Sequence, residues 1–353
     1  MKDPIISCIM SNYNTDPNMF RQSVESILNQ TFRNFELILI DDHSANNESK
    51  NIVSEYAKID DRIVPVFNRE NMGLAGALNE GLKIATGKYI ARFDTDDICC
   101  VDRFEKQIEY MEKVGADICS TFGHCFGASN SIVSTAFYDC RSVSAMLLFS
   151  CYIYHTPVMM KKSFLDKHNL YYDESYDKAE DFDLFTRCND AGAKICIMPD
   201  VMFYYRIHTA SACHTEKSRQ VILSEIICKR QLDEKEICYT EDELELHYIL
   251  CGLREFDPTI YQELCQWCDK LIDENGERKA YNSKVFKKVV YNRLLTAIAK
   301  ADIPVAKKIK FVISDRRLCN ATNIYSVLYK KLYALGYKLS GREKEWMRIV
   351  SGE

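Results

Sequence analysis

The first half of the chain predicts an α/β fold with a mostly parallel, Rossmann-like sheet flanked by helices. Three observations indicate this fold. Apolar runs of strand length alternate with amphipathic helical stretches, their spacing suits strand–helix–strand units, and three of the strands end in polar residues, namely Tyr13, Asp42 and Asp94. Because right-handed crossovers bring the carboxyl ends of parallel strands to one edge, we expect these three residues to gather there, where open α/β sheets bind ligands.

The individual elements follow from local signals. The apolar run Ile5–Met10 predicts a buried strand, and Thr15 or Asp16 is expected to cap the next helix, with Pro17 in its first turn. Further strands are expected over 34–40, 63–67, 87–93, 117–122 and 201–206, and helices over 47–59, from about 71, and over 102–114. Beyond about residue 215 the apolar period is helical, so we expect a sheet domain over 1–215 and a helical C-terminal region over 216–353.

Composition is that of a globular protein with about two domains: 353 residues, 47% hydrophobic and 27% charged. The N-terminal stretch lacks the apolar core of a signal peptide, and no apolar run reaches the roughly 18 residues that span a bilayer. A cytoplasmic location is therefore expected. The sixteen cysteines lie mostly in apolar stretches and are interpreted as small core residues. Cys265-Gln-Trp-Cys268 lacks a second pair at zinc spacing, so no metal or redox role is expected.

Charge is distributed unevenly along the chain. The net charge is −5, but from Lys279 to the C-terminus Lys and Arg exceed Asp and Glu by 12, which leaves −17 for the rest. Such a tail indicates an anionic partner: phospholipid at the inner face of the cell membrane, a lipid-diphosphate acceptor, or nucleic acid; a solvated helical face or a homodimer contact is the alternative. Nucleic acid is the least expected partner. The tyrosines of this tail are spaced by four residues, as in a helical stripe that packs on a core or a membrane surface: Tyr325, Tyr329, Tyr333 and Tyr337.

One acidic turn points to a metal. The apolar run from Tyr89 ends in Asp94, Asp96 and Asp97. Carboxylates this close repel one another unless a cation lies among them, and Mg²⁺ or Mn²⁺ bridged to a substrate diphosphate is the natural candidate. An acidic surface turn is the alternative. The chain has no Gly-x-Gly-x-x-Gly after its first strand and no Walker loop, so the usual dinucleotide and P-loop sites are not expected.

Four short patterns occur in a fixed order: Ser7-Cys-Ile-Met-Ser-Asn-Tyr-Asn14, Leu39-Ile-Asp-Asp-His-Ser44, Ala91-Arg-Phe-Asp-Thr-Asp-Asp97 and Ala179-Glu-Asp-Phe-Asp-Leu-Phe-Thr-Arg187. Together they resemble family 2 of the inverting glycosyltransferases. Tyr204-Tyr-Arg-Ile-His208 follows them, and the stretch from Asn71 to Gln107 is also similar to the family's pattern. The resemblance covers about residues 4–212. It implies the GT-A fold, a nucleotide-sugar donor that is usually UDP-linked, and a divalent metal, in the manner of enzymes of capsule, lipopolysaccharide or O-antigen synthesis.

The resemblance implies a role for each matching residue. Tyr13 would pack against the base, and Asp42 would accept a hydrogen bond from the uracil imide N–H. Asn14, Asn71 and Arg92 are expected on the nucleotide side, although Arg92 suits either a phosphate or the acidic cluster itself. Asp94 would contact the ribose or the metal, Asp96 would ligate the metal, and His208 is a further candidate ligand. Asp181 would be the general base, in preference to Asp183, and acceptor or donor-sugar contacts are expected from Glu180, His155 and Arg206.

The chain departs from the family pattern at three places. Ser11 or Asn12 stands where Pro is usual, His43 where Gly is common, and Cys99-Cys100 where more polar residues are usual. None of these removes a chemical group that sugar transfer needs.

The sequence therefore predicts a metal-dependent hexosyl- or N-acetylhexosaminyltransferase that uses a nucleotide sugar, with a saccharide or lipid-linked saccharide as acceptor. A nucleotidyltransferase is a first alternative, but it would be expected to show a Gly-rich basic loop in place of Ser11-Asn-Tyr-Asn14. A degenerate sugar-nucleotide-binding or scaffold protein is a second. The intact Asp94, Asp96 and Asp181 argue against it.

Overall fold

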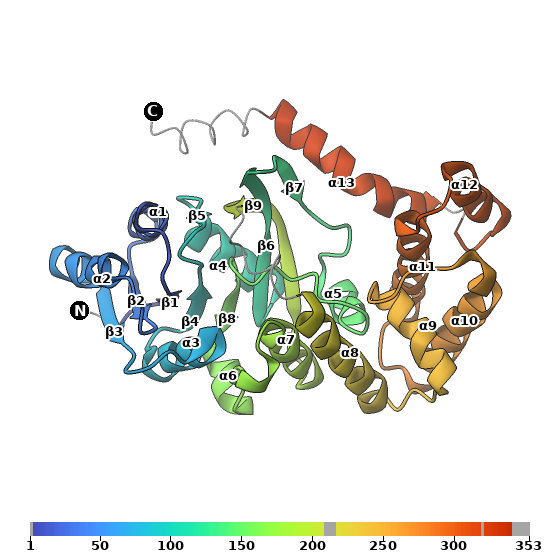
Figure 1. Ribbon diagram of the computed structural model, residues 1–353, viewed down its shortest axis with the longest axis horizontal. Helices are drawn as coiled ribbons and strands as arrows, with labels where there is room; N and C mark the ends of the chain where they lie inside the picture. Colours follow the sequence, from blue (N-terminus) through green and yellow to red (C-terminus); the bar gives the residue numbers. More distant parts are fainter. Residues whose placement is uncertain (1–2, 208–216, 319–320, 341–353) are drawn as a thin grey trace.

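A single mixed sheet organises the computed structural model, which describes residues 3–207, 217–318 and 321–340 (Figure 1). The sheet has nine strands in the order β3-β2-β1-β4-β8-β6-β9-β5, with β7 paired to β6. Its strands are β1 (Ile6–Asn12), β2 (Phe35–Asp41), β3 (Ile63–Phe67), β4 (Tyr89–Arg92), β5 (Ile98–Cys99), β6 (Ile118–Gly127), β7 (Ser131–Val133), β8 (Met159–Lys161) and β9 (Ile195–Ile207).

The N-terminal half has the predicted alternation of strands and helices. Strands β1 to β4 run parallel to one another, and alternate residues of β1 enter different cores: Cys8 and Met10 pack with α1, α2 and α4, while Ile9 packs with α3. These helices are α1 (Pro17–Leu28), α2 (Asn47–Ile59), α3 (Gly73–Ile84) and α4 (Arg103–Val114). The predicted cap of α1 is confirmed, since the Asp16 side chain accepts from the N–H groups of Asn18 and Met19. The Rossmann-like core is therefore in place.

Beyond β4 the sheet becomes mixed. Strand β8 lies between β4 and β6 and is antiparallel to both. Strand β9 pairs in parallel with β6 along the whole length of β6, with irregular register near Phe122. Both β6 and β9 are longer than the sequence predicted. The helices between β7 and β9 in the chain are α5 (Cys140–Met146), α6 (Lys162–His168) and α7 (Glu180–Asp190).

The C-terminal part is helical, as the periodicity predicted. Its helices are α8 (Lys217–Glu234), α9 (Glu241–Cys251), α10 (Tyr261–Arg278), α11 (Ser283–Lys300), α12 (Val305–Ser314) and α13 (Ala321–Leu339). Cys265 and Cys268 are buried free thiols on α10, as expected of core residues. Figure 1 shows α9 to α12 grouped beside the sheet domain, while α13 returns across it toward β7. None of the helices in the described ranges combines the length and apolarity that crossing a membrane requires.

Candidate active site

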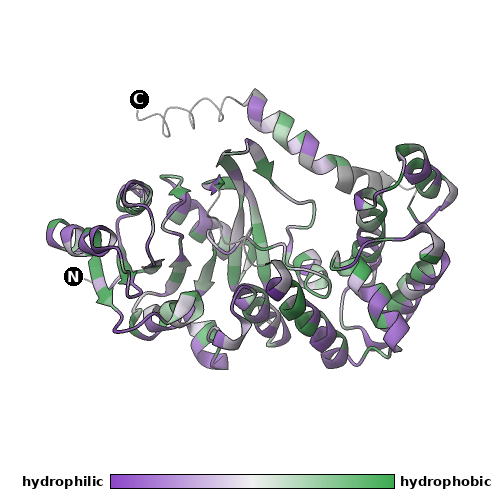
Figure 2. Ribbon diagram, in the orientation of Figure 1, coloured by the Kyte–Doolittle hydropathy of each residue, from purple (hydrophilic) through white to green (hydrophobic). Residues whose placement is uncertain are grey.

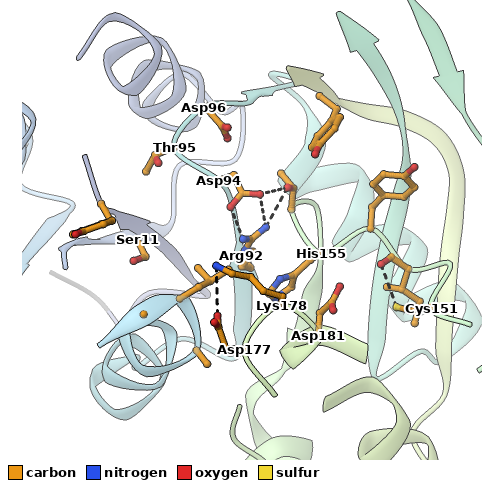
Figure 3. Close-up of a pocket in the computed structure, with 18 of the residues that line it drawn as sticks. Ser11, Arg92, Asp94, Thr95, Asp96, Cys151, His155, Asp177, Lys178 and Asp181 are labelled. Carbon is orange, nitrogen blue, oxygen red and sulfur yellow. Dashed lines mark hydrogen bonds and ion pairs between the residues drawn. The ribbon is translucent and has the colours of Figure 1, made fainter. Parts of the chain in front are cut away.

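A cavity of about 1160 Å³ opens at the carboxyl ends of β1, β2 and β4. The three residues that the sequence placed at this edge, Tyr13, Asp42 and Asp94, all line it. Its far wall comes from the segment before β8, which includes His155, and from the start of α7, which supplies Asp181. In Figure 3, Asp94 and Asp96 lie on one side of the cavity and Asp181 on the other. The sheet edge and α7 thus enclose one chemical site.

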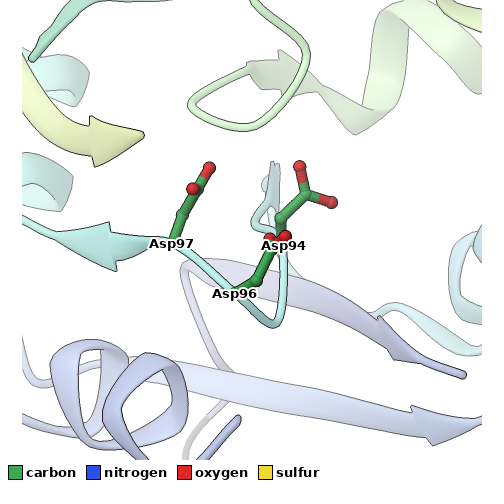
Figure 4. A group of neighbouring side chains, drawn as sticks. All are labelled: Asp94, Asp96 and Asp97. Carbon is green, nitrogen blue, oxygen red and sulfur yellow. The ribbon is translucent and has the colours of Figure 1, made fainter. Parts of the chain in front are cut away.

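The acidic turn after β4 gathers three carboxylates. One oxygen from each of Asp94, Asp96 and Asp97 lies within 4.8 Å of the others (Figure 4). Asp97 is buried; its Oδ1 accepts from the N–H of Arg206 at 2.8 Å, but its Oδ2 has no hydrogen-bond partner. Burial, together with the charges of Asp96 and Asp94, raises the pKa of Asp97 well above its usual value. An orphaned buried oxygen within a cluster of acids suits a divalent cation, so these residues fit Mg²⁺ or Mn²⁺.

Asp94 is held rigidly by its neighbours. The buried Arg92 donates from Nη1 to Asp94 Oδ2 at 2.6 Å, and its second terminal nitrogen pairs with Oδ1. The Thr156 hydroxyl also donates to Asp94 and accepts from Arg92. Of the two partners that the sequence allowed for Arg92, the structure shows the acidic cluster. A bidentate pair of this kind fixes the carboxylate before any ligand arrives.

A second buried arginine, Arg103, supports the backbone at Arg92. Arg103 donates from Nη2 to the carbonyl oxygens of Arg92 and Val158, both at 3.2 Å, and from Nε to Gln107 at 3.0 Å. Gln107 in turn donates to the carbonyl oxygens of Cys119 and Pro157, both at 2.7 Å. One turn of α4 therefore joins β4, β6 and the segment that carries Thr156.

After β1 and β2, Tyr13 is exposed at the cavity wall and Asp42 is a buried lining residue. Asp42 Oδ1 accepts from Asn68 Nδ2 at 2.7 Å and from the N–H of Met72 at 3.0 Å, and the Asn71 amide donates to the Asp42 carbonyl at 3.1 Å. These bonds wrap the segment before α3 around Asp42, which leaves the carboxylate fixed at the cavity wall.

Two loop residues beside Tyr13 adopt a left-handed backbone. Asn14 has a φ of 54° and lies outside the cavity lining, where it donates from its N–H to Ser44 Oγ at 3.0 Å and accepts from the N–H of Asn46. His43 has a φ of 60°. Since this conformation favours glycine, the family's preference for Gly at that position has a physical reason, and His43 tolerates the same backbone at some cost.

The three carboxylates in the first turn of α7 have different surroundings. Asp181 lines the cavity and its Oδ1 accepts from the N–H of Phe182 at 2.7 Å, whereas Glu180 is buried beside it, outside the lining. Burial raises the pKa of both acids, and the charge of Asp181 raises that of Glu180 further. Asp183 is fully buried and accepts from Arg187 Nη2 at 2.6 Å and Arg230 Nη1 at 2.7 Å. Asp181 therefore faces the cavity, while Asp183 joins α7 to α8.

The histidine and arginine predicted as sugar contacts differ in position. His155 lines the cavity, with its Nε2 2.7 Å from the Tyr172 hydroxyl; burial and the charge of Arg92 lower its pKa well below the usual value, so it is neutral. Arg206 lies outside the lining and donates from Nε to the Asp96 carbonyl at 2.7 Å, which braces the acidic turn. His208 lies outside the described residues.

Comparison with known proteins places the chain in a family. The model of glycosyl transferase family 2 matches residues 7–171. An uncharacterised glycosyltransferase, MJ1057, of Methanocaldococcus jannaschii is 33% identical over 59% of this chain and 72% of its own length. The chain belongs to glycosyl transferase family 2. Another relative of this glycosyltransferase is WfaP of Escherichia coli, a UDP-Glc:α-D-GlcNAc-diphosphoundecaprenol β-1,3-glucosyltransferase, which is 30% identical over 59% of this chain and 79% of WfaP.

Solved structures show the same fold. Residues 1–349 of S. aureus TarS, in a crystal structure with UDP, align with a TM-score of 0.55 at 15% identity, covering 92% of this glycosyltransferase and 91% of that chain. The predicted GT-A-type fold followed by a helical C-terminal region is thereby confirmed.

Several residues that line the cavity of this glycosyltransferase were missed by sequence reasoning. Two are cations: Lys178, which has a left-handed φ of 77°, and Arg219, in the first turn of α8. The aromatic residues Tyr152, Tyr154 and Tyr205 form another part of the wall. Two of them stood beside or within a sequence signal, since Lys178 stands two residues before Glu180 and Tyr205 belongs to the pattern Tyr204-Tyr-Arg-Ile-His208. Arg219, Tyr152 and Tyr154 reach the cavity through the packing of distant segments.

Proposed function

We propose that this family 2 glycosyltransferase moves a hexosyl or N-acetylhexosaminyl group from a UDP-sugar to a saccharide or lipid-linked saccharide, with inversion at the anomeric carbon. The arrangement of the cavity carries the proposal: a carboxylate cluster that suits a metal–diphosphate complex faces a separate carboxylate, Asp181, across a space large enough for a sugar. The UDP-Glc donor and diphosphoundecaprenol acceptor named for WfaP, and the UDP-GlcNAc bound by TarS, support the substrate classes.

On the donor side, Tyr13 would stack on the base and Asp42 would accept from the imide N–H of uracil. The buried position of Asp42 and its fixed Oδ1 favour this role, because a preorganised acceptor loses little entropy on binding. Asp94 and Asp96, with Asp97, would hold Mn²⁺ or Mg²⁺, which supplies a positive charge that stabilises the departing diphosphate.

On the acceptor side, Asp181 would act as general base. The acceptor hydroxyl attacks the anomeric carbon as its proton passes to the Asp181 carboxylate, and the electron pair of the breaking bond leaves with the diphosphate. Because attack comes from the face opposite the leaving group, one base suffices for inversion. Its burial suits Asp181 to this role, since a carboxylate with a raised pKa is a stronger base. The neutral His155 and the tyrosine wall would contact the sugars.

The two regions of the chain would have different roles. We propose that residues 1–215 bind the donor and perform the transfer, whereas residues 216–353 contribute acceptor, membrane-surface or dimer contacts. Arg219 at the cavity wall supports a share of the C-terminal region in the site.

Calorimetry of UDP binding tests the donor site. UDP is expected to bind the wild type in the presence of Mn²⁺, and the Asp96→Ala variant is expected to lose at least about tenfold in affinity. Asp61→Ala, which removes an exposed carboxylate between α2 and β3, is the matched control and should bind like the wild type. If UDP fails to bind under any condition, this proposal is wrong, and the alternative of a degenerate sugar-nucleotide-binding or scaffold protein replaces it. If UDP does bind, a screen of UDP-sugars for hydrolysis identifies the donor.

A further inference from the structure

Helix α13 exposes a stripe of leucines. Leu328, Leu332 and Leu335 are 43%, 53% and 56% exposed, and their spacing of four and three residues places them on one helical face. A different face carries the tyrosines that pack toward the sheet: the ring centroids of Tyr329 and Tyr333 lie 6.4 and 5.0 Å from that of Phe122. One side of α13 is thus anchored on the sheet, and its leucines face solvent.

Helix α12 has a second exposed apolar face. Val305, Ile309 and Ile313 are 69%, 51% and 68% exposed at a regular spacing of four, and no residue of the helix is fully buried. Figure 1 shows α12 followed by α13 along one margin of the molecule, and Figure 2 shows apolar and polar bands alternating along them. Exposed branched aliphatic side chains on consecutive helices are more than the scattered single residues that a monomer surface normally carries.

The charged residues of both helices are all positive. Together α12 and α13 contain six lysines and no Asp or Glu. Lys307 and Lys310 are exposed on α12, and Lys331 and Lys338 are exposed on α13. At 100° per residue, Lys331 lies beside the leucine stripe, so its ammonium group and the leucines would meet the same surface. Lysine next to leucine and isoleucine on a surface helix is the composition of helices that lie in the headgroup region of anionic membranes.

The anchored face connects this surface to the cavity. Phe122, on which Tyr329 and Tyr333 pack, is itself a lining residue of the cavity, as is Val133 on β7. Whatever binds the leucine face of α13 would therefore lie across this helix from the part of the cavity wall that contains Phe122.

We propose that α12 and α13 dock the enzyme on an anionic lipid bilayer, with Leu328, Leu332, Leu335, Val305, Ile309 and Ile313 entering the headgroup region. The docking itself follows from these faces alone, and the benefit for catalysis rests on the proposed function: it brings the cavity, through the wall that contains Phe122 and Val133, near the surface in which a lipid-linked saccharide resides. Such binding combines apolar burial with attraction to anionic headgroups, so it should weaken with salt.

Co-sedimentation of the full chain with vesicles tests the docking. Wild-type protein is expected to bind vesicles of phosphatidylcholine with about one-third phosphatidylglycerol far better than pure phosphatidylcholine. The triple variant Leu328→Ser, Leu332→Ser, Leu335→Ser should lose at least about tenfold in binding to them. The control variant Ile59→Ser, Ile84→Ser, Val114→Ser removes exposed aliphatic side chains from α2, α3 and α4 and should bind like the wild type.

Further measurements separate the outcomes. Both triple variants should keep the thermal unfolding midpoint and the Mn²⁺-dependent UDP affinity of the wild type, so loss of vesicle binding would not reflect misfolding or a damaged donor site. Failure of UDP binding would remove the proposed function but leave a positive vesicle result standing. Equal binding to both lipid compositions, or normal binding by the leucine variant, overturns the docking proposal. It is also overturned if the wild type ignores vesicles and light scattering shows a dimer that the leucine variant dissociates, because the face is then a contact between two copies of this chain.

Discussion

Two aspartates in the first turn of α7 provide a sharp test of the catalytic assignment, because replacing each by Asn should have a different consequence. Asp181 faces the cavity and is the proposed general base, so Asp181→Asn is expected to lower kcat by about 10²- to 10⁴-fold, the usual contribution of such a base. Affinity for UDP with Mn²⁺ should stay within about twofold of the wild type, because the lost interaction belongs to the transition state.

Asp183→Asn should instead damage the fold. Its carboxylate is fully buried between Arg187 and Arg230, at N–O distances of 2.6 and 2.7 Å. Breaking a buried pair by removing one partner costs about 3–5 kcal/mol, but these arginines are 27% and 24% exposed, so water takes over part of the solvation. We therefore expect the free energy of unfolding to fall by about 2–3 kcal/mol. Turnover per folded molecule should remain near that of the wild type.

The effect of Asp181→Asn on stability has the opposite sign. Burial raises the pKa of Asp181, so the fold disfavours its charged form, and the stability of the native state falls as pH rises through that pKa. A neutral amide lacks this cost, and the variant should be at least as stable as the wild type at pH 8.

Transfer assays and urea unfolding on both variants check this pair of predictions. A variant Asp181→Asn that keeps more than about a tenth of kcat would refute the base assignment, since a base contributes far more. Loss of turnover in Asp183→Asn, with UDP affinity and stability unchanged, would transfer the role to Asp183.

Further predictions concern the donor site and pH. Thr156→Val removes the hydroxyl between Asp94 and Arg92 without changing side-chain shape; it should lower the unfolding free energy by about 1–2 kcal/mol and weaken UDP binding in calorimetry, and unchanged values would show that Asp94 needs no such support. Asp42→Ala removes the proposed uracil acceptor and should reduce UDP affinity about tenfold without abolishing the Mn²⁺ requirement. Because the deprotonated Asp181 is the proposed base and burial raises its pKa, kcat/KM should fall on acidification at a higher pH than for an ordinary aspartate; an acid limb near pH 4 would contradict this.

The sequence predicted the elements whose signals are local. Helix α1 begins at Pro17 because Asp16 caps it, and β2 is an apolar run buried on both faces, so a short window contains the whole reason for each. Strands β5, β7 and β8 have only two or three residues and exist because they pair with β9, β6 and β4. The partners of β8 and β5 lie tens of residues away along the chain, whereas β7 pairs with the adjacent strand β6. For the same cause a sheet predicted as mostly parallel contains antiparallel neighbours beyond β4.

The candidate site shows the same division. Asp94, Asp96 and Asp181 were found because they belong to short patterns with a fixed order. Thr156 was not, because its role depends on meeting Asp94 from 62 residues away. The Arg103–Gln107 network likewise serves carbonyl groups of β4, β6 and the segment before β8, which no local pattern reveals.

The charge balance around the cavity bears on how the donor binds. A diphosphate would approach three carboxylates, and the strongest cation beside them, Arg92, is already bound through both terminal nitrogens to Asp94. Among the described residues that line the cavity, this leaves Lys178 and Arg219 as the other arginine or lysine side chains, and Lys178 lies 3.6 Å from Asp177. Arg92 offsets the charge of Asp94, so neutralising the other carboxylates of the cluster together with a diphosphate requires charge from solution. For this reason UDP without a divalent cation should bind far more weakly than UDP with one, and equal affinity in both conditions would mean that the acidic turn does not face the diphosphate at all.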